Sequence, residues 1–187
     1  MRAFLREVLV IIIAAIVIFF LLQTTVQKSS VNGYSMEPSL QDGQQLLVNK
    51  VVYHLHEPER GEIIIFQPPY QPEDAIPFIK RIIGLPGESV EITDGIVYIH
   101  KNGEVFPLDE PYIKEPPSRD FRGDIIHEDE YFVLGDNRNN SNDSRDGWTV
   151  PRQNIIGKAW LSIWPPGEWG FVPNYSLNEQ LESSGSK

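Results

Sequence analysis

The sequence has 187 residues, with 16 basic and 26 acidic side chains, a formal net charge of -10 and no cysteine. This length fits one domain, or at most two. The absence of cysteine excludes a disulfide-stapled scaffold and any cysteine-ligated zinc or iron–sulfur site. The negative net charge argues against a nucleic-acid partner bound through a basic face.

An uncharged stretch occupies residues 8–27, and its first fifteen residues are all apolar. A helix of this length spans about 30 Å, the thickness of a bilayer core. A buried core helix would carry a polar face. A cleaved signal peptide would need small residues after the stretch, whereas no alanine lies between Ala15 and Ala75. We therefore predict an uncleaved transmembrane anchor over 8–27, behind a short cytoplasmic segment, 1–7.

Positive charges near the ends of this anchor predict its orientation. Arg2, Arg6 and the α-amino group precede it, while Lys28 alone follows closely. The N-terminus is therefore expected in the cytoplasm and the rest of the chain outside. When Arg2, Arg6 and Glu7 are set aside, 14 basic and 25 acidic residues are left, so the exterior part carries a net charge of -11.

The exterior part is predicted to be mostly β, with an antiparallel sheet, because short Val, Ile and aromatic runs recur between turn signals. Asp94-Gly95 and Asn102-Gly103 are typical of two-residue type I′ hairpin turns. The proline-rich stretches 68–77 and 107–117 cannot be central strands. The expected strands are 45–52, 62–66, 77–83, 89–92, 96–100, 131–134 and 155–164.

Ser35 lies in the segment 33–40, which reads Gly-Tyr-Ser-Met-Glu-Pro-Ser-Leu. The glycine before and the proline after this serine constrain its backbone. A serine in such a turn is usually only a turn residue, and the G-x-S-x-G nucleophile elbow is absent because Glu37 replaces its second glycine. Ser35 follows the apolar run by thirteen residues. It therefore lies at most about 45 Å from the end of that run, near the membrane surface.

Lys80 and Arg81 are adjacent within the otherwise apolar run 77–83. Because side chains alternate along a strand, one of the two must face the apolar side unless the strand lies at an edge. An edge lysine that prevents aggregation is the simpler alternative. A buried lysine would have its pKa lowered, by up to about 3–5 units, and could act as a general base for a serine.

The segment 135–148 is rich in Asp and Asn, as a calcium loop would be. It does not match the EF-hand pattern, because Arg138 occupies the second ligand position and no glycine stands at the sixth. A polar loop with a local Asp–Arg pair is the alternative. His54 and His56 have no identifiable third ligand, so we expect no metal site.

Together, and in this order behind an anchor, these motifs resemble those of bacterial type I signal peptidases, the membrane-bound serine endopeptidases that remove signal peptides. The resemblance covers nearly the whole chain in layout. It is specific because four short motifs, here called boxes, occur in the same order and carry the same kinds of chemical group as in that family. The boxes are 33–40, 60–66, 80–87 and 135–145.

The resemblance implies a Ser/Lys dyad without histidine, in which Ser35 is the nucleophile and Lys80 the general base. Ser141 matches the residue whose hydroxyl orients the lysine amine. The backbone N–H of Ser35 would stabilise the oxyanion, an effect worth about 3–4 kcal/mol where such a donor is removed. Some members carry a serine donor at the position of Gly33, so the second donor in this chain is left open.

The resemblance also implies a structural ion pair between Asp143 and Arg145, which supports the site together with Gly135. The implied partners are the signal peptides of exported pre-proteins, cleaved after small residues in an A-x-A-like pattern, and the lipid bilayer of a bacterial cell membrane. Neither a cofactor nor nucleic acid is implied, and the substrate-binding residues are not assigned.

The domain boundaries follow from the length of the segment between two boxes. Only 46 residues separate Glu88 from Gly135, fewer than the large second domain of some family members has. We therefore expect one catalytic β domain over 28–177, with a small extension at 101–128, followed by a flexible tail at 178–187.

Two other functions are open. One is another Ser/Lys processing protease of the same fold, such as a conjugation-pilus maturase or a self-cleaving SOS-repressor-type protein, although the anchor disfavours the latter. The other is a catalytically silent, anchored β domain that binds exported proteins, although it would not need the dyad. Trp160, Trp164 and Trp169 are expected in the core or at its rim, with the bilayer interface as the alternative for the last two.

Overall fold

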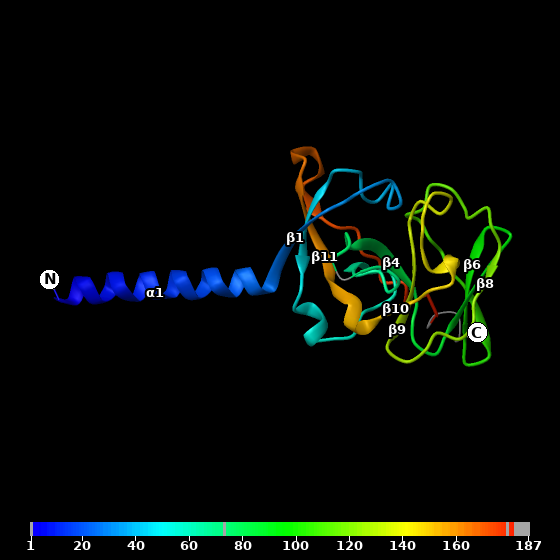
Figure 1. The fold of residues 1–187 in the computed structure, drawn as a ribbon, viewed down its shortest axis with the longest axis horizontal. Helices are drawn as coiled ribbons and strands as arrows, with labels where there is room; N and C mark the ends of the chain where they lie inside the picture. Colours follow the sequence, from blue (N-terminus) through cyan, green and yellow to red (C-terminus); the bar gives the residue numbers. More distant parts are fainter. Residues whose placement is uncertain (1, 73, 179, 182–187) are drawn as a thin grey trace.

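The N-terminal helix is separate from the β strands that make up the rest of the molecule. The computed structural model describes residues 2–72, 74–178 and 180–181, without the side chains at positions 2, 3, 5, 18–22 and 24. Helix α1 (Arg2–Thr25) extends away from the strands and continues directly into β1 (Val26–Ser30) (Figure 1). In this part of the chain, no helix has the length and apolar character needed to cross a membrane.

Eight strands form the first sheet, and every pairing in it is antiparallel. Besides β1, they are β2 (Gln45–Asn49), β3 (Ile63–Phe66), β4 (Phe78–Gly84), β9 (Glu130–Leu134), β10 (Val150–Pro151), β11 (Ile155–Trp164) and β12 (Gly170–Phe171). Their order is β1-β2-β11-β3-β4-β9-β10, with β12 paired to β11. Strand β4 therefore lies inside the sheet, between β3 and β9.

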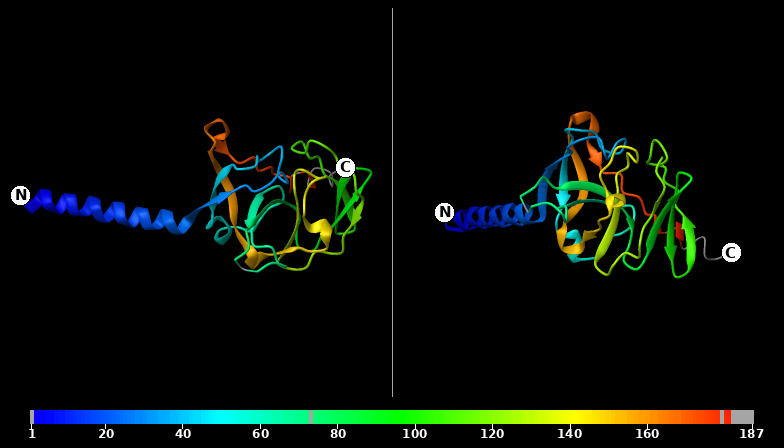
Figure 2. Two further views of the ribbon diagram at one scale, coloured as in Figure 1. Left: turned by 45° about the horizontal axis from the view of Figure 1, so that its top comes forward. Right: turned by 45° about the vertical axis from the view of Figure 1, so that its right-hand side comes forward.

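A second, antiparallel sheet lies on the far side of the first sheet from α1 (Figure 2). Its strands are β5 (Ser89–Thr93), β6 (Ile96–Lys101), β7 (Glu104–Pro107) and β8 (Phe121–Arg122), in the order β7-β6-β5-β8. Positive φ angles of 52° at Asp94 and 54° at Asn102, each followed by a glycine with positive φ, confirm the two predicted hairpin turns. The mostly β, antiparallel fold class is thus confirmed.

The second sheet contains more than the expected extension at 101–128. The β5–β6 hairpin, which starts at Ser89, also belongs to this sheet. This sheet has its own buried cluster, which includes Val90, Val97 and Ile99 and meets Phe132 and Leu134 of the first sheet. The shared cluster joins the two sheets into one body.

The seven expected strands are all present; 155–164 has the expected ends, and the other six have shifted ends. The first of them ends at Asn49 and not at 52, because the Asn49 side chain accepts the backbone N–H groups of Val51 and Val52, at 3.1 Å each, and turns the chain. Five strands were not expected: β1, β7, β8, β10 and β12. The short 3₁₀ helices are η1 (Val52–His54), η2 (Ser144–Asp146), η3 (Arg152–Asn154) and η4 (Pro166–Glu168).

Both faces of the first sheet are buried, which explains the unbroken apolar run of β3. Ile63 and Ile65 pack into one cluster, while Ile64 and Phe66 pack into another on the opposite face. Each such side chain contributes about 1.5–3 kcal/mol of hydrophobic stabilisation. Met36 lies in the same cluster as Ile63, so this cluster also anchors the segment that carries Ser35.

Two expectations about the C-terminal part differ from the structure. Of the predicted flexible tail, residues 178, 180 and 181 are in helical conformation and Leu181 is buried beside the second sheet, while 179 and 182–187 lie outside the described residues. Trp164 and Trp169 are 54% and 67% exposed, so they do not pack in the core as expected. Both lie in or next to the β11–β12 hairpin.

Candidate active site

Ser35 lies on a turn that is anchored from both sides. The chain before it is paired through the Val31 N–H, which donates to the Gln44 carbonyl at 2.8 Å. The chain after it is held by Met36 and Leu40, whose side chains are buried in the core. Gly33 has a φ of +89°, a left-handed conformation that favours glycine, and its N–H donates to Asp42 Oδ1 at 2.7 Å. The hydroxyl of Ser35 is consequently held at the surface of the first sheet.

Lys80 approaches this serine from the middle of β4. Its Nζ donates to Ser35 Oγ at 2.7 Å and to the Ile79 carbonyl at 3.1 Å. Since β4 pairs with β3 on one side and β9 on the other, the alternative of a protective edge lysine is wrong. Only 5% of Lys80 is exposed. Burial lowers the pKa of Lys80 to about 8, although the carboxylates of Asp143 and Asp136 act in the opposite direction.

Arg81, on the other face of β4, was not assigned a role from sequence. Its guanidinium makes a buried two-point ion pair with Asp136, at 2.9 and 2.6 Å. It also donates to the Gly61 carbonyl at 2.7 Å and lies 4.1 Å from the centre of the Tyr112 ring. Because neighbouring side chains of a strand point to opposite faces, Lys80 and Arg81 could not both face solvent. This was the sequence signal that one of the two would need a buried partner. The pair fastens β4 to the start of the loop 135–148.

The same loop is held internally by the predicted pair of Asp143 and Arg145, which the structure brings together. Their two contacts measure 2.8 and 2.9 Å. Asp143 Oδ2 also accepts the Gly135 N–H at 3.1 Å, and the Asp143 side chain caps η2. A carboxylate with this many donors fixes the backbone on both sides of Ser141.

Ser141 lies beside the dyad, but the hydrogen bond that we expected to Lys80 is not formed. Its Oγ is buried and has no hydrogen-bond partner among the described residues. A Cβ at Gly135 would lie 2.3 Å from this Oγ and 2.5 Å from the Ser35 carbonyl oxygen. Glycine at 135 therefore allows the loop to approach Ser35 closely.

Asn137 is a second residue that sequence reasoning missed. Its N–H donates to the Ser35 carbonyl at 3.0 Å, and its Nδ2 donates to the Tyr34 carbonyl at 3.1 Å. These contacts orient the two peptide groups on either side of the Ser35 Cα, including the one that carries the Ser35 N–H. The Ser35 N–H itself donates to no acceptor within the described residues, as a donor for an oxyanion should be.

The dyad opens into a cleft of about 320 Å³. Its polar lining residues are Ser35, Lys80, Asn32 and Asn142. The apolar wall of the cleft consists of Val31, Met36, Ile76, Pro77, Phe78 and Ile79. The cleft is suited to short apolar side chains next to a bond that Ser35 could attack.

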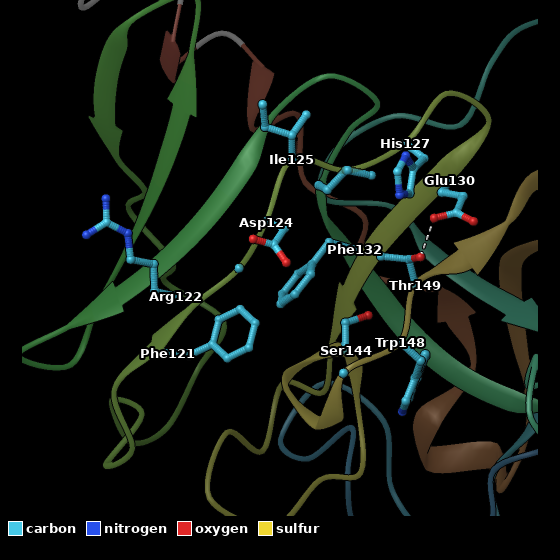
Figure 3. Close-up of a pocket in the computed structure, with 13 residues that line it drawn as sticks. Phe121, Arg122, Asp124, Ile125, His127, Glu130, Phe132, Ser144, Trp148 and Thr149 are labelled. Carbon is cyan, nitrogen blue, oxygen red and sulfur yellow. Dashed lines mark hydrogen bonds between the residues drawn. The ribbon is translucent and has the colours of Figure 1, made fainter.

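A separate cavity of about 340 Å³ lies between β8 and β9 (Figure 3). Its lining includes Phe121, Phe132 and Trp148, and the Thr149 hydroxyl donates to Glu130 Oε2 at 2.5 Å. Neither Ser35 nor Lys80 lines it, so despite its slightly larger volume it is not the candidate active site. Across the described part of the chain, no three His, Asp or Glu side chains gather as a metal ion would require.

The chain is similar to known signal peptidases. The family model described as signal peptidase, peptidase S26, matches residues 4–164. A probable signal peptidase I-2 from Synechocystis sp. is 43% identical over 157 residues, which cover 80% of this chain and 68% of that protein. A signal peptidase I from Leptolyngbya laminosa is 46% identical over 149 residues, covering 75% and 71%. The crystal structure of a signal peptidase I from Enterococcus faecalis V583 is 33% identical, with a TM-score of 0.46, and covers 55% of this chain and 97% of that chain.

Proposed function

Because the chain belongs to the signal peptidase family, peptidase S26, and is a serine peptidase, we propose that it removes N-terminal signal peptides from exported pre-proteins. Cleavage takes place after small residues in an A-x-A-like pattern, which the narrow apolar cleft beside Ser35 accommodates. The observation that carries this proposal is the 2.7 Å contact between Lys80 Nζ and Ser35 Oγ.

In the first step, Ser35 Oγ attacks the carbonyl carbon of the scissile bond while neutral Lys80 accepts the hydroxyl proton. The oxyanion that forms accepts the Ser35 N–H. When the C–N bond breaks, Lys80 returns this proton to the leaving amine. An acyl-enzyme ester on Ser35 is left.

In the second step, a water molecule attacks the ester and gives its proton to Lys80. The Ser35–acyl bond then breaks, the product leaves as a carboxylic acid, and Ser35 Oγ regains a proton from Lys80. Burial of Lys80 supports this role, because a lysine with a pKa near its value in water would be protonated at neutral pH. Ser141 orients the amine once a substrate is bound.

We further propose that α1 anchors the enzyme in a bacterial cell membrane, with the N-terminus in the cytoplasm and the β domain outside. The uncharged stretch 8–27 supports this, as do the exposed apolar side chains along α1. The exposed rings of Trp164 and Trp169 are suited to the bilayer interface. The domain limits of 28–177 are part of the same proposal.

Cleavage of a pre-protein by the purified full chain tests the proposed activity. The parent is expected to shorten the pre-protein at its signal-peptide junction, and Ser35→Ala and Lys80→Ala to lower the rate by at least about a thousandfold. Ser30→Ala and Lys114→Ala are matched controls at exposed positions that do not line the cleft. Undiminished cleavage by either dyad variant would contradict the mechanism. A parent inactive in every detergent would favour the anchored binding domain.

A further inference from the structure

Asn142 is one of the polar residues that line the cleft, and it has no role in the mechanism above. It lines the cleft together with Ser35 and Lys80, and it follows Ser141 directly in the chain. The next residue, Asp143, is fully buried in its ion pair with Arg145, so the backbone that carries Asn142 is fixed. An amide side chain on a fixed backbone can bind a substrate group at a defined place.

Tyr70 fixes the orientation of this amide from a distant part of the chain. Its hydroxyl donates to Asn142 Oδ1 at 3.3 Å, and its ring lies 5.6 Å from that of Trp148 and 6.4 Å from that of Phe78. Because the amide oxygen already accepts the tyrosine hydroxyl, the opposite end of the amide presents the two N–H groups of Nδ2. The Asn142 side chain is exposed, and within the described residues its Nδ2 donates to no acceptor, so these groups are available to a ligand in the cleft.

The direction of the substrate follows from the proton transfers. Lys80 Nζ must reach the leaving nitrogen, so the residues after the scissile bond lie on the Lys80 side of Ser35. Asn142 lines the same cleft as Lys80, from the loop that carries Ser141. The first acceptor that every peptide offers on this side is the carbonyl of the residue after the scissile bond.

We propose that Asn142 Nδ2 donates a hydrogen bond to the backbone carbonyl of the residue after the scissile bond, and that Tyr70 is the positioning residue that orients the Asn142 amide. The inference rests on the proposed function and adds a binding determinant for the leaving part of the substrate. A backbone acceptor suits an enzyme whose substrates differ in sequence after the cleavage site.

Two substrates can distinguish a contact of Asn142 with the leaving part of the substrate from a general effect on the dyad. Both have the same acyl part, which ends in Ala-x-Ala. One continues as a peptide after the scissile bond, and the other is a simple anilide whose leaving group has no carbonyl. Asn142→Ala is expected to lower kcat/KM on the peptide about three- to tenfold, mainly through KM, and to leave the anilide unchanged. The pH profile should not move, because Lys80 is untouched.

Two variants test the role of Tyr70 and guard against misfolding. Tyr70→Phe should lose about twofold on the peptide alone, and it should add nothing in the Asn142→Ala background, because it acts through the same amide. Asn142→Leu is similar in size, uncharged and lacks the N–H donors, so it should show the same selective loss without an added charge near Lys80. Asn140→Ala, at an exposed position of the same loop, is the matched control and should match the parent on both substrates.

Equal losses on the peptide and the anilide in Asn142→Ala and Asn142→Leu would overturn the inference, as would no loss on either substrate. Both outcomes leave the proposed function intact, since the parent then cleaves its substrates. A parent that cleaves neither substrate nor a pre-protein overturns the proposed function, and the inference falls with it.

Discussion

A lysine in water has a pKa near 10.4 and is neutral in only about one molecule in 2,500 at pH 7. Burial lowers the pKa of Lys80 to about 8, which raises the neutral fraction at pH 7 to about one in ten. Its amine also already contacts the hydroxyl that it would deprotonate, at 2.7 Å. The burial of Lys80 and its contact with the Ser35 hydroxyl together make this lysine suited to act as a general base without histidine.

Gly135 provides a test of the close packing around this dyad. Gly135→Ala would place a methyl group 2.3 Å from Ser141 Oγ and 2.5 Å from the Ser35 carbonyl oxygen. We expect it to destabilise the fold by about 1–3 kcal/mol and to lower kcat at least about a hundredfold. Steady-state kinetics and urea unfolding measure the two effects.

Gly167→Ala is the matched control for this substitution. Gly167 has no atom within 4 Å of the added methyl group and no positive φ. The activity and the urea unfolding midpoint of the Gly167→Ala variant should equal those of the parent. Full activity in Gly135→Ala would contradict the close approach of the loop to Ser35.

At the scale of the elements, β4 directs one charged side chain to each face of the first sheet. Lys80 reaches Ser35 on one face, while Arg81 reaches Asp136 on the other. The loop that follows β9 therefore begins with a buried ion pair and continues to Ser141 and Asn142. The position of the loop relative to β4 depends on that pair.

Asp136→Asn should lower the free energy of unfolding by about 3–5 kcal/mol, because it leaves the Arg81 guanidinium buried without a counter-charge. Urea denaturation measures this loss. The Asp136 charge also raises the pKa of Lys80, so its removal should move the acidic limb of the pH–rate profile to lower pH.

Glu57→Gln is the control variant. It removes the exposed partner of Arg152 and should lower the free energy of unfolding by less than about 1 kcal/mol. Equal losses in the two variants would contradict the structural role of the buried pair.

Sequence reasoning succeeded where the signal was local. The two hairpins were predictable because Asp94-Gly95 and Asn102-Gly103 carry the conformational preference of the turn themselves. Strand β1 was not predictable, since its residues are polar and it is a strand only through pairing with β2.

At the candidate active site, the four sequence motifs identified the dyad residues but not most of the residues that contact and position them. Ser35 and Lys80 could be paired because each box has a matched chemistry in a known family. Asp136, Asn137 and Tyr70 carry no such signal: their partners lie 55, 103 and 72 residues away in the chain. Contacts over such separations depend on the final packing of both sheets, which no sequence window contains.

At the scale of the whole molecule, the chain divides into a helix with an apolar sequence and an acidic β body. Residues 28–187 carry a net charge of -11, while the first 27 residues carry +1. Long-range attraction to an anionic bilayer would therefore not hold the β body at a membrane. The proposed association with a membrane would have to depend on the apolar stretch 8–27 and on apolar contacts.

Membrane fractionation of cells that express the full chain tests this dependence. The parent should stay in the membrane pellet after alkaline carbonate extraction. The double variant Ile12→Lys, Ile16→Lys should be extracted, because each charge near the middle of the stretch 8–27 costs about 2.5–3.5 kcal/mol on insertion. The matched variant Ile12→Leu, Ile16→Leu should behave as the parent does. Extraction of the parent would contradict the proposed anchor.

The pH dependence of kcat/KM for pre-protein cleavage by the full chain tests the dyad most directly. The base must be neutral to accept the Ser35 proton, so activity should fall with one ionisation as the pH drops below the pKa of Lys80. The expected acidic limb has its midpoint at about 8. A limb that rises only above about pH 10, where a lysine in water titrates, would contradict a buried Lys80 as the general base.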